Sequence, residues 1–204
     1  MVAIIDYDAG NIKSVEKAIQ RLGQEAVVTR DADLLRGADH IILPGVGAFG
    51  DAMEKLKKYE LIPVIREVID RGTPFLAICL GLQLLFEESE ESPGIPGLGI
   101  FKGSIRRIPD TEGLKVPQIG WNSLHFPRES RLFRGCQEDA YVYFVHSYYL
   151  KAAEESIVSA ETEYGITIHA AVEKDHVFAC QFHPEKSSEV GLHMLKNFLD
   201  IRRA

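Results

Sequence analysis

Cysteine is scarce in this chain, and long runs of one charge are missing. The 204 residues include only Cys79, Cys136 and Cys180, an odd number without close spacing. That count argues against a disulfide framework and against a zinc cluster, so we expect a reducing, cytoplasmic environment. Lys and Arg never run beyond two in succession, and the net charge is −7. Nucleic acid and anionic membranes are therefore poor candidates for the main partner.

Long apolar stretches are also absent from the sequence. No run approaches the roughly 20 residues of a membrane span. The N-terminus reaches an acid at Asp6 and carries too little charge before it for a secretion signal. A chain of this length is expected to fold as one domain, residues 1–204, rather than two.

The first 90 residues alternate between strand and helix patterns. Short apolar runs predict strands at 2–5, 25–29, 40–44 and 74–79. Helical spacing of apolar residues predicts helices at 10–23, at roughly 51–71 and after Cys79. This alternation indicates an α/β fold with a mostly parallel central sheet and helices on both of its faces.

The second half has a different pattern. A turn-rich connector, 92–99, is followed by aromatic, strand-like segments that we expect to add antiparallel strands to the parallel core. Residues 166–185 predict two strands joined by a tight turn. A final helix is predicted from Ser187 or Ser188, with one apolar stripe.

Cys79 lies where a predicted strand becomes a helix. A thiol at the first turn of a helix is near unsatisfied N–H groups and the positive end of the helix dipole, both of which favour the nucleophilic thiolate. Ala77 and Gly81 are small enough for the crowded strand-turn-helix corner that presents a nucleophile. A buried, inert cysteine fits these residues equally well.

A base for this thiol is available in the segment "CQFHPE". If the chain is extended through Pro184, His183 and Glu185 project on one face, so the carboxylate can orient the imidazole. A histidine with an ordinary surface or core role remains the alternative. The N–H of Leu80 and the glycine-rich segment 44–50 are candidates for binding an oxyanion, although such a loop can equally bind phosphate or simply turn.

Three separated motifs, "PGVGAFG", "AICLGLQLL" and "QFHPEKS", occur in this order. Together they resemble the triad-type (class I) glutamine amidotransferases, a flavodoxin-like α/β family that hydrolyses the glutamine amide. "DYDAGNIKSV", "PQIGWN" and "YFVHSYY" are similar to the branch that supplies ammonia to imidazole glycerol phosphate synthase in histidine biosynthesis. The resemblance runs from about residue 2 to 200. Ala77 departs from the family pattern, which has Gly there, but is also small.

The resemblance implies a role for each matching residue. Cys79 attacks the glutamine carboxamide and forms a thioester, His183 transfers the proton, and Glu185 orients His183. Backbone N–H groups of Leu80 and Val46 are the expected oxyanion donors. The expected contacts to L-glutamine come from Gly47, Gln83, Glu91, Ser147 and Tyr148. No cofactor and no metal are expected.

The resemblance also implies a separate partner, because nearly the whole chain is used by the glutaminase fold. The partner is a cyclase subunit with a (β/α)8 barrel, which forms a heterodimer and receives ammonia through a channel. It makes imidazole glycerol phosphate and an aminoimidazole carboxamide ribotide. Four residues match the family's interface positions: Asn11, Trp121, Tyr143 and Lys186. An N-cap, two core aromatics and a solvated charge are their ordinary alternatives.

Three other functions remain open from the residues. One is a glutaminase subunit of another pathway, of the pyridoxal phosphate, purine or anthranilate type, although "GNIKSV" and "IGWN" speak against it. Another is a non-catalytic ligand-binding relative or thiol sensor, which predicts a missing triad member. The last is a metal site at His183, Glu185 and His146, which lack the close spacing usual for zinc.

Overall fold

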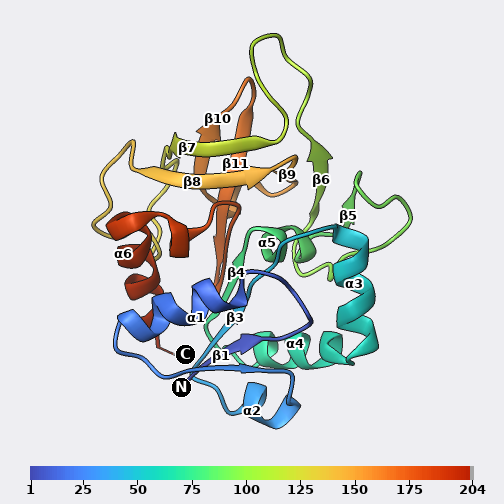
Figure 1. Cartoon of the computed structure of the whole chain (residues 1–204), viewed down its shortest axis with the longest axis vertical. Helices are drawn as coiled ribbons and strands as arrows, with labels where there is room; N and C mark the ends of the chain where they lie inside the picture. The colour runs from blue at the N-terminus through green and yellow to red at the C-terminus, as the bar shows by residue number, and fades with distance from the viewer. Residues whose placement is uncertain (203–204) are drawn as a thin grey trace.

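The computed structural model describes residues 1–202, and a seven-stranded sheet is its main feature (Figure 1). The strand order is β10-β11-β12-β4-β3-β1-β2. Five of these strands, β12, β4, β3, β1 and β2, are parallel to one another. β11 pairs antiparallel with β12, and β10 pairs antiparallel with β11. The bounds are β1 Val2–Ile5, β2 Ala26–Thr29, β3 His40–Leu43, β4 Phe75–Ile78, β10 Val158–Glu163, β11 Thr167–Lys174 and β12 Val177–Cys180. The predicted mostly parallel sheet with added antiparallel strands is confirmed.

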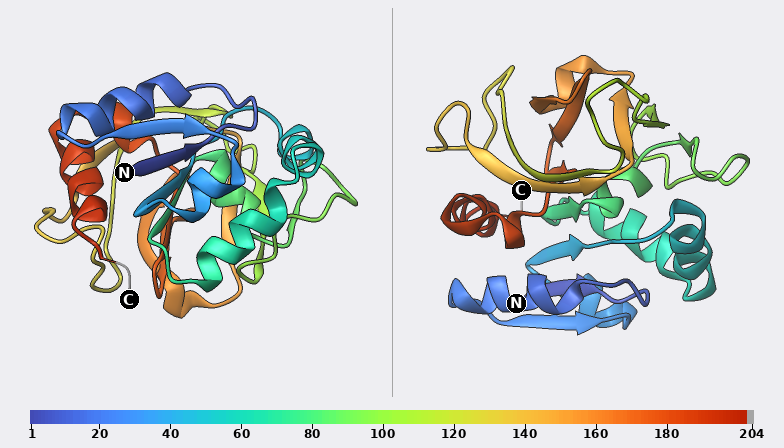
Figure 2. Two further views of the ribbon diagram at one scale, coloured as in Figure 1. Left: turned by 90° about the horizontal axis from the view of Figure 1, so that it is seen from below. Right: turned by 45° about the horizontal axis from the view of Figure 1, so that its top comes forward.

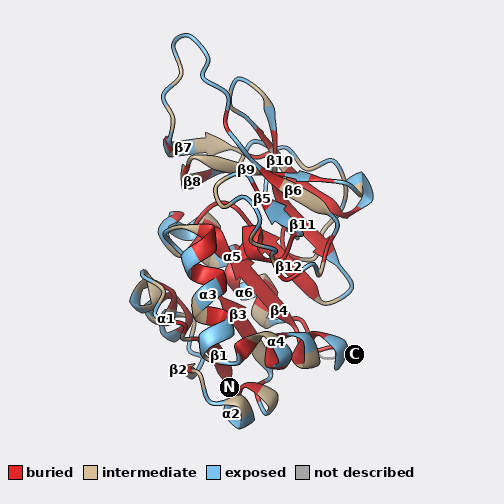
Figure 3. Ribbon diagram, turned by 90° about the vertical axis from the view of Figure 1, so that its right-hand side faces the viewer, coloured by how far each residue is buried: buried red, intermediate tan, exposed pale blue. Residues whose placement is uncertain are grey.

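Helices cover both faces of this sheet (Figure 2). Helices α1 (Ile12–Arg21) and α6 (Ser188–Leu199) lie on one face, and α2 (Ala32–Arg36), α3 (Phe49–Lys58) and α4 (Leu61–Asp70) on the other. Alternate side chains of β1 show why: Val2 and Ile4 pack in the same core as α1 and α6, whereas Ala3 and Ile5 pack with α2, α3 and α4. Strands buried on both faces are apolar at every position (Figure 3).

Most of the aromatic segments that were expected to extend the central sheet form two small separate sheets instead, so that expectation is wrong for them. One contains β5 (Glu88–Ser89), β6 (Gly103–Arg107) and β9 (Tyr148–Ala152). The other is an antiparallel ribbon of β7 (Gln118–Ser123) and β8 (Tyr141–His146). The remaining short elements are α5 (Leu80–Leu84) and two 3-10 turns, η1 (Glu155–Ile157) and η2 (Pro184–Lys186).

The single helix predicted at 51–71 is wrong, because two helices occupy this segment. Glu60 lies between them in the left-handed region, with φ 55°. Pro63 falls in the first turn of α4, where its missing N–H costs nothing, whereas one continuous helix would place it in the interior. The polar segment before β3, for which no element was predicted, forms α2, and Asp31 caps this helix by accepting hydrogen bonds from the N–H groups of Asp33 and Leu34.

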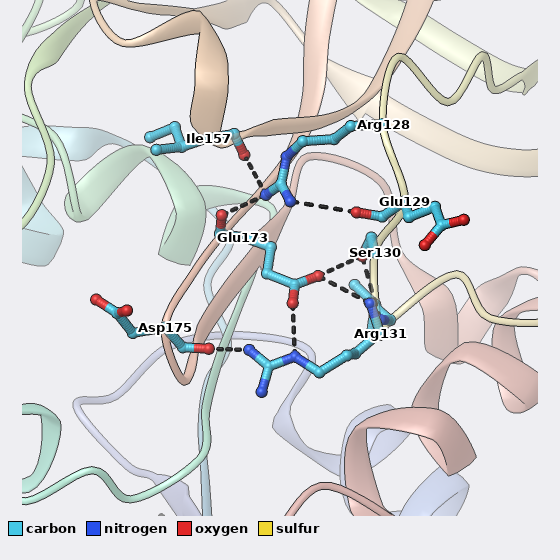
Figure 4. A network of polar contacts seen from close by, with 8 residues as sticks. Arg128, Glu129, Ser130, Arg131, Ile157, Glu173 and Asp175 are labelled. Atoms are coloured by element: carbon cyan, nitrogen blue, oxygen red, sulfur yellow. Dashed lines mark hydrogen bonds and ion pairs between the residues drawn. The ribbon is translucent and has the colours of Figure 1, made fainter.

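A polar network fixes the loop 126–135 to β11 (Figure 4). The Glu173 carboxylate accepts hydrogen bonds from the Ser130 hydroxyl and from Nε of Arg131, at 2.5 and 2.7 Å. Arg128 donates to the carbonyl oxygens of Ile157 and Glu173. A cavity of about 590 Å³ is lined by this loop and Glu173, and its lining residues include neither cysteine nor histidine. The network therefore ties this loop to β11.

The parallel strands bring the predicted site residues to one edge of the sheet. β1, β3, β4 and β12 run in the same direction, so the segments that follow them meet there. Cys79 directly follows β4, and His183 comes three residues after β12. Among the helices of residues 1–202, none is both long and apolar enough to cross a bilayer.

Candidate active site

Cys79 sits at a strained corner between β4 and α5. Its φ of 56° and ψ of −111° are unusual for a residue with a side chain. A Cβ on Gly81 would lie only 2.1 Å from the carbonyl oxygen of Leu43, so glycine is required at this position. That same Cβ would lie 3.5 Å from the Ala77 methyl group, so alanine fits on the other side of the corner. The expectation that small residues are needed on both sides of Cys79 therefore has a steric reason.

His183 and Glu185 form a buried pair beside this corner. Nδ1 of His183 and Oε1 of Glu185 are 2.7 Å apart, and both side chains are almost fully buried. The pair does not arise from an extended segment, as the sequence suggested. Pro184 instead begins the 3-10 turn η2, because its fixed φ suits the first position of a helical turn. The turn brings the carboxylate back to the ring.

The surroundings of His183 favour its protonated form. Burial lowers the pKa of His183, but interactions with the Cys79 sulfur and the Glu185 carboxylate outweigh burial and raise it to about 9. Nε2 of the ring is buried and has no hydrogen-bond partner among residues 1–202. The ring can therefore hold a proton opposite the sulfur while Glu185 occupies its other nitrogen.

Asn11 and Ser187 support this pair, and the sequence did not suggest that role. Each stands at the N-cap position of a helix, yet neither side chain caps its own helix. Asn11 donates instead to Oε1 of Glu185, at 2.5 Å. The Ser187 hydroxyl donates to the carbonyl oxygen of His183, at 2.6 Å, and accepts from the N–H of Tyr143. Two helix starts thus hold the pair in place.

The predicted oxyanion donors lie next to Cys79. The N–H of Leu80 donates to the carbonyl oxygen of Gly45, at 3.3 Å, so this donor is in use within the chain. Val46 and Gly47 line the same cavity as Cys79, and Gly47 has φ 102°, which glycine adopts without strain.

A cavity of about 290 Å³ opens at Cys79 and contains every predicted substrate contact. Gly47, Gln83, Glu91, Ser147 and Tyr148 all line it. Gln83 is buried, and its amide N–H groups donate to the carbonyl oxygen of Tyr148 and to Oε1 of Gln181, both at 3.0 Å. Oε2 of Glu91 accepts from the N–H of Phe49 at the start of α3, at 2.7 Å. Gln181, which sequence reasoning missed, also contacts the Cys79 sulfur.

The predicted interface residues lie around one exposed region. Trp121 is 52% exposed, so it is not a core residue, and its ring meets that of Tyr143 edge to face at 6.1 Å. Ile119 and Tyr141, from the same ribbon, are also exposed. The carbonyl oxygen of Tyr143 accepts from the N–H of His183, at 2.9 Å. The exposed ribbon is therefore bonded directly to the buried pair.

His146, considered above as a metal ligand, is engaged elsewhere. Its ring nitrogens face the carbonyl oxygen of Tyr148, at 2.8 Å, and the side-chain amide of Gln118, at 2.9 Å. Burial lowers the pKa of His146 to about 4, so the ring is neutral near pH 7. Within residues 1–202 we find no cluster of three or more histidine, cysteine or acidic side chains arranged to hold a metal ion.

The strained corner at Cys79, the His183–Glu185 pair and the adjacent cavity lie at one edge of the sheet. This is the arrangement expected of a thiol-dependent hydrolase. The family model described as "Glutamine amidotransferase class-I" matches residues 3–201. The chain belongs to this family.

Two relatives point to one branch of this family. The chain is 50% identical over 202 residues to the imidazole glycerol phosphate synthase subunit HisH of Moorella thermoacetica, covering 99% of this chain and 95% of that protein. It is also 50% identical over 204 residues to the HisH subunit of Methanothermobacter thermautotrophicus, covering 100% of each. The resemblance drawn from the sequence motifs is confirmed.

Solved structures with lower identity share the fold. One is a crystal structure of a glutamine amidotransferase, with a TM-score of 0.75, 22% identity and coverage of 97% of this chain and 99% of that one. Another is PurLQS from Thermotoga maritima, with a TM-score of 0.74, 19% identity and coverage of 98% and 97%. At these identities the likeness supports the α/β fold alone.

Proposed function

We propose that residues 1–204 act as a single glutaminase domain, the ammonia-producing subunit of imidazole glycerol phosphate synthase in histidine biosynthesis. The reaction converts L-glutamine to glutamate and ammonia. Full-length identity to the HisH subunits supports the pathway. The observation that supports the chemistry most directly is the buried His183–Glu185 pair beside a thiol at a strained corner.

The proposed reaction has two stages. In the first, the Cys79 thiolate attacks the carboxamide carbon, and the protonated His183 gives its proton to the departing ammonia. In the second, His183 takes a proton from water, water attacks the thioester, and the bond between carbon and sulfur breaks with its electron pair returning to sulfur. Glu185 holds the imidazole in orientation throughout. N–H groups of Leu80 and Val46 receive the oxyanion in both stages.

The cavity residues are proposed to position glutamine by its α-amino and carboxylate groups. Glu91 is the one carboxylate among the lining residues, so it is suited to the ammonium group. Its other oxygen remains available because Phe49 binds Oε2. Gly47, Ser147 and Tyr148 are proposed to contact the opposite end, and the free Oε1 of Gln83 to accept from the substrate.

The ammonia is proposed to pass to a separate cyclase subunit with a (β/α)8 barrel, which docks on the exposed ribbon. Trp121 and Tyr143 are suited to be anchors there, since exposed aromatic residues recur at the centre of interfaces. Lys186 and Asn11 lie on the segments beside the ribbon, and we propose that they contact the cyclase as well.

The test is ammonia release from glutamine by the parent chain and by Cys79→Ser, each with the cyclase subunit present. We expect Cys79→Ser to release no ammonia above background while keeping the circular dichroism spectrum of the parent. Ammonia release by the variant at more than a trace of the parent rate would refute the nucleophile assignment. Release by the parent that is equal with and without the cyclase would indicate a stand-alone hydrolase.

A further inference from the structure

Gln181 lies within the core at the Cys79 sulfur and has no role in the reaction proposed above. Its side chain is fully buried, directly after β12. Its Nε2 lies 3.7 Å from Sγ of Cys79, and its Oε1 accepts from Gln83 at 3.0 Å. A buried amide with both ends engaged is held in one position.

The direction of this amide follows from the chemistry of its neighbours. The carbonyl oxygen of Tyr148 can only accept, so Gln83 must present its N–H groups to it. The second N–H of Gln83 then requires an acceptor, which fixes the Oε1 of Gln181 on that side. The N–H groups of Gln181 are consequently directed at the sulfur. His146 donates to the same carbonyl oxygen from Nδ1 and helps to hold it in place.

We propose that Gln181 is a catalytic residue whose amide N–H donates a hydrogen bond to the Cys79 sulfur. A thiolate accepts such a bond far better than a thiol or a thioester sulfur does, because the charge on sulfur strengthens it. The bond therefore stabilises sulfur as the attacking thiolate. It stabilises the same thiolate again when the carbon–sulfur bond of the thioester breaks and the electron pair returns to sulfur. The effect on turnover rests on the proposed function, whereas the hydrogen bond itself does not.

The bond is measurable through the reactivity of the sulfur without any substrate. Iodoacetamide alkylates thiolates, and peptide mass analysis separates Cys79 from the other two cysteines. Gln181→Met removes the donor with little change in length, and Gln181→Glu keeps the acceptor for Gln83 while replacing the donor by a carboxylate. Gln118→Met is the matched control, because Gln118 is a buried glutamine that contacts His146 and not the sulfur.

We expect Cys79 of Gln181→Met to alkylate about tenfold more slowly than in the parent at pH 7, the size expected for a hydrogen bond to a charged group. The midpoint of its alkylation profile should move to higher pH, and Gln181→Glu should be slower still. Gln118→Met should match the parent. Cys136, which is half-buried and lies outside the site, should alkylate at one rate in every variant that is folded.

Alkylation of Gln181→Met at the parent rate and with the parent pH profile would overturn the assignment. If this variant does not fold, as an altered Cys136 rate would reveal, Gln181→Glu carries the test. That variant keeps the acceptor for Gln83 and deletes the donor, so an unchanged Cys79 rate there would also overturn the proposal. Fast alkylation of the parent, without ammonia release even when the cyclase and its ligand are present, would refute the proposed function and leave the donor assignment intact.

Discussion

The backbone N–H of Leu80 donates a hydrogen bond of 3.3 Å to the carbonyl oxygen of Gly45. Leu80 directly follows Cys79, the proposed nucleophile, so its N–H is one of the two proposed oxyanion donors. Because the Gly45 carbonyl oxygen engages this donor, we expect that it must move away from Leu80 before the N–H can bind an oxyanion. In this arrangement one of the two proposed oxyanion donors is already engaged within the chain.

We therefore expect the isolated chain to hydrolyse glutamine slowly and the cyclase with its ligand to accelerate it. Loss of one oxyanion donor typically lowers kcat by about a hundredfold or more, so the rise should be of this order. Glutamate formation by the isolated chain, the heterodimer and the heterodimer with ligand measures it. An isolated chain that is already as fast as the liganded heterodimer would contradict the blocked donor.

Asn11→Gly should reduce activity without reducing stability. The amide of Asn11 binds Glu185 and does not cap α1, and its φ of 67° suits glycine. Loss of a hydrogen bond to a buried carboxylate should lower kcat by about tenfold, whereas an Asn-to-Gly change at an N-cap costs only a few tenths of a kcal/mol. Glutaminase kinetics in the heterodimer and urea unfolding of the variant measure the two effects.

Asp31→Ala is the matched control and should show the opposite result. Asp31 caps α2 by accepting from the N–H groups of Asp33 and Leu34. Its removal should cost about 1 kcal/mol of unfolding free energy and leave kcat unchanged, because its two hydrogen bonds are made within α2. If Asn11→Gly proved to be the less stable variant with parent activity, Asn11 would be an ordinary cap.

Trp121→Ala should weaken the heterodimer without unfolding the chain. The indole is half exposed, so its removal leaves no large cavity in the core. An aromatic anchor at an interface typically contributes about 2 kcal/mol or more, which corresponds to a Kd roughly thirtyfold higher. Analytical ultracentrifugation measures association, and a thermal melt measures stability. Leu34→Ala, an exposed apolar residue on α2, is the control that should leave Kd unchanged, and a large loss of stability in Trp121→Ala would assign the indole to the fold instead.

The contributions of His183 and His146 to the stability of the fold should depend on pH in opposite directions. His183 has a folded pKa of about 9, above its ordinary value of 6.5, so its contribution is complete below pH 6.5 and is lost as pH rises to 9. His146 has a folded pKa of about 4, so stability is lost as pH falls from 6.5 to 4, where only the unfolded chain gains the proton.

Urea unfolding of the parent, His183→Asn and His146→Asn across pH 4 to 9 separates these effects. The stability difference between parent and His183→Asn should shrink from pH 6.5 upward. The loss of stability toward pH 4 should be shallower in His146→Asn than in the parent. Parallel curves for all three proteins would show that neither pKa is shifted by folding.

The sequence predicts the sheet well because each strand in it obeys a local rule. β1 and β4 are apolar at every position, and β3 is apolar after its first residue, His40, as burial on both faces requires. The two-helix segment at 51–71 was predictable too, since Pro63 cannot lie inside one continuous helix. The hydrophobic spacing continues across the break between α3 and α4. Nothing in the sequence at Glu60 predicts its left-handed conformation.

The candidate site was predictable only in part. Cys79, His183 and Glu185 belong to short motifs, so local sequence identifies them. The supporting residues depend on contacts between distant segments: Asn11 meets Glu185 across 174 positions, and Gln181 meets Cys79 across 102. Asn11 and Ser187 also look like helix caps. The sequence at the start of a helix does not show whether the side chain caps that helix or turns away from it. Only the three-dimensional arrangement separates the two roles.

The most direct test of the account is trapping the glutamyl thioester on Cys79. The heterodimer with the cyclase ligand is mixed with glutamine, quenched in acid during turnover and digested, and the peptide that contains Cys79 is analysed by mass. We predict a mass increase of one glutamyl group on that peptide, removable by hydroxylamine and absent in Cys79→Ser. Steady glutamate production with the peptide always unmodified, or with the glutamyl group on another residue, would contradict the account.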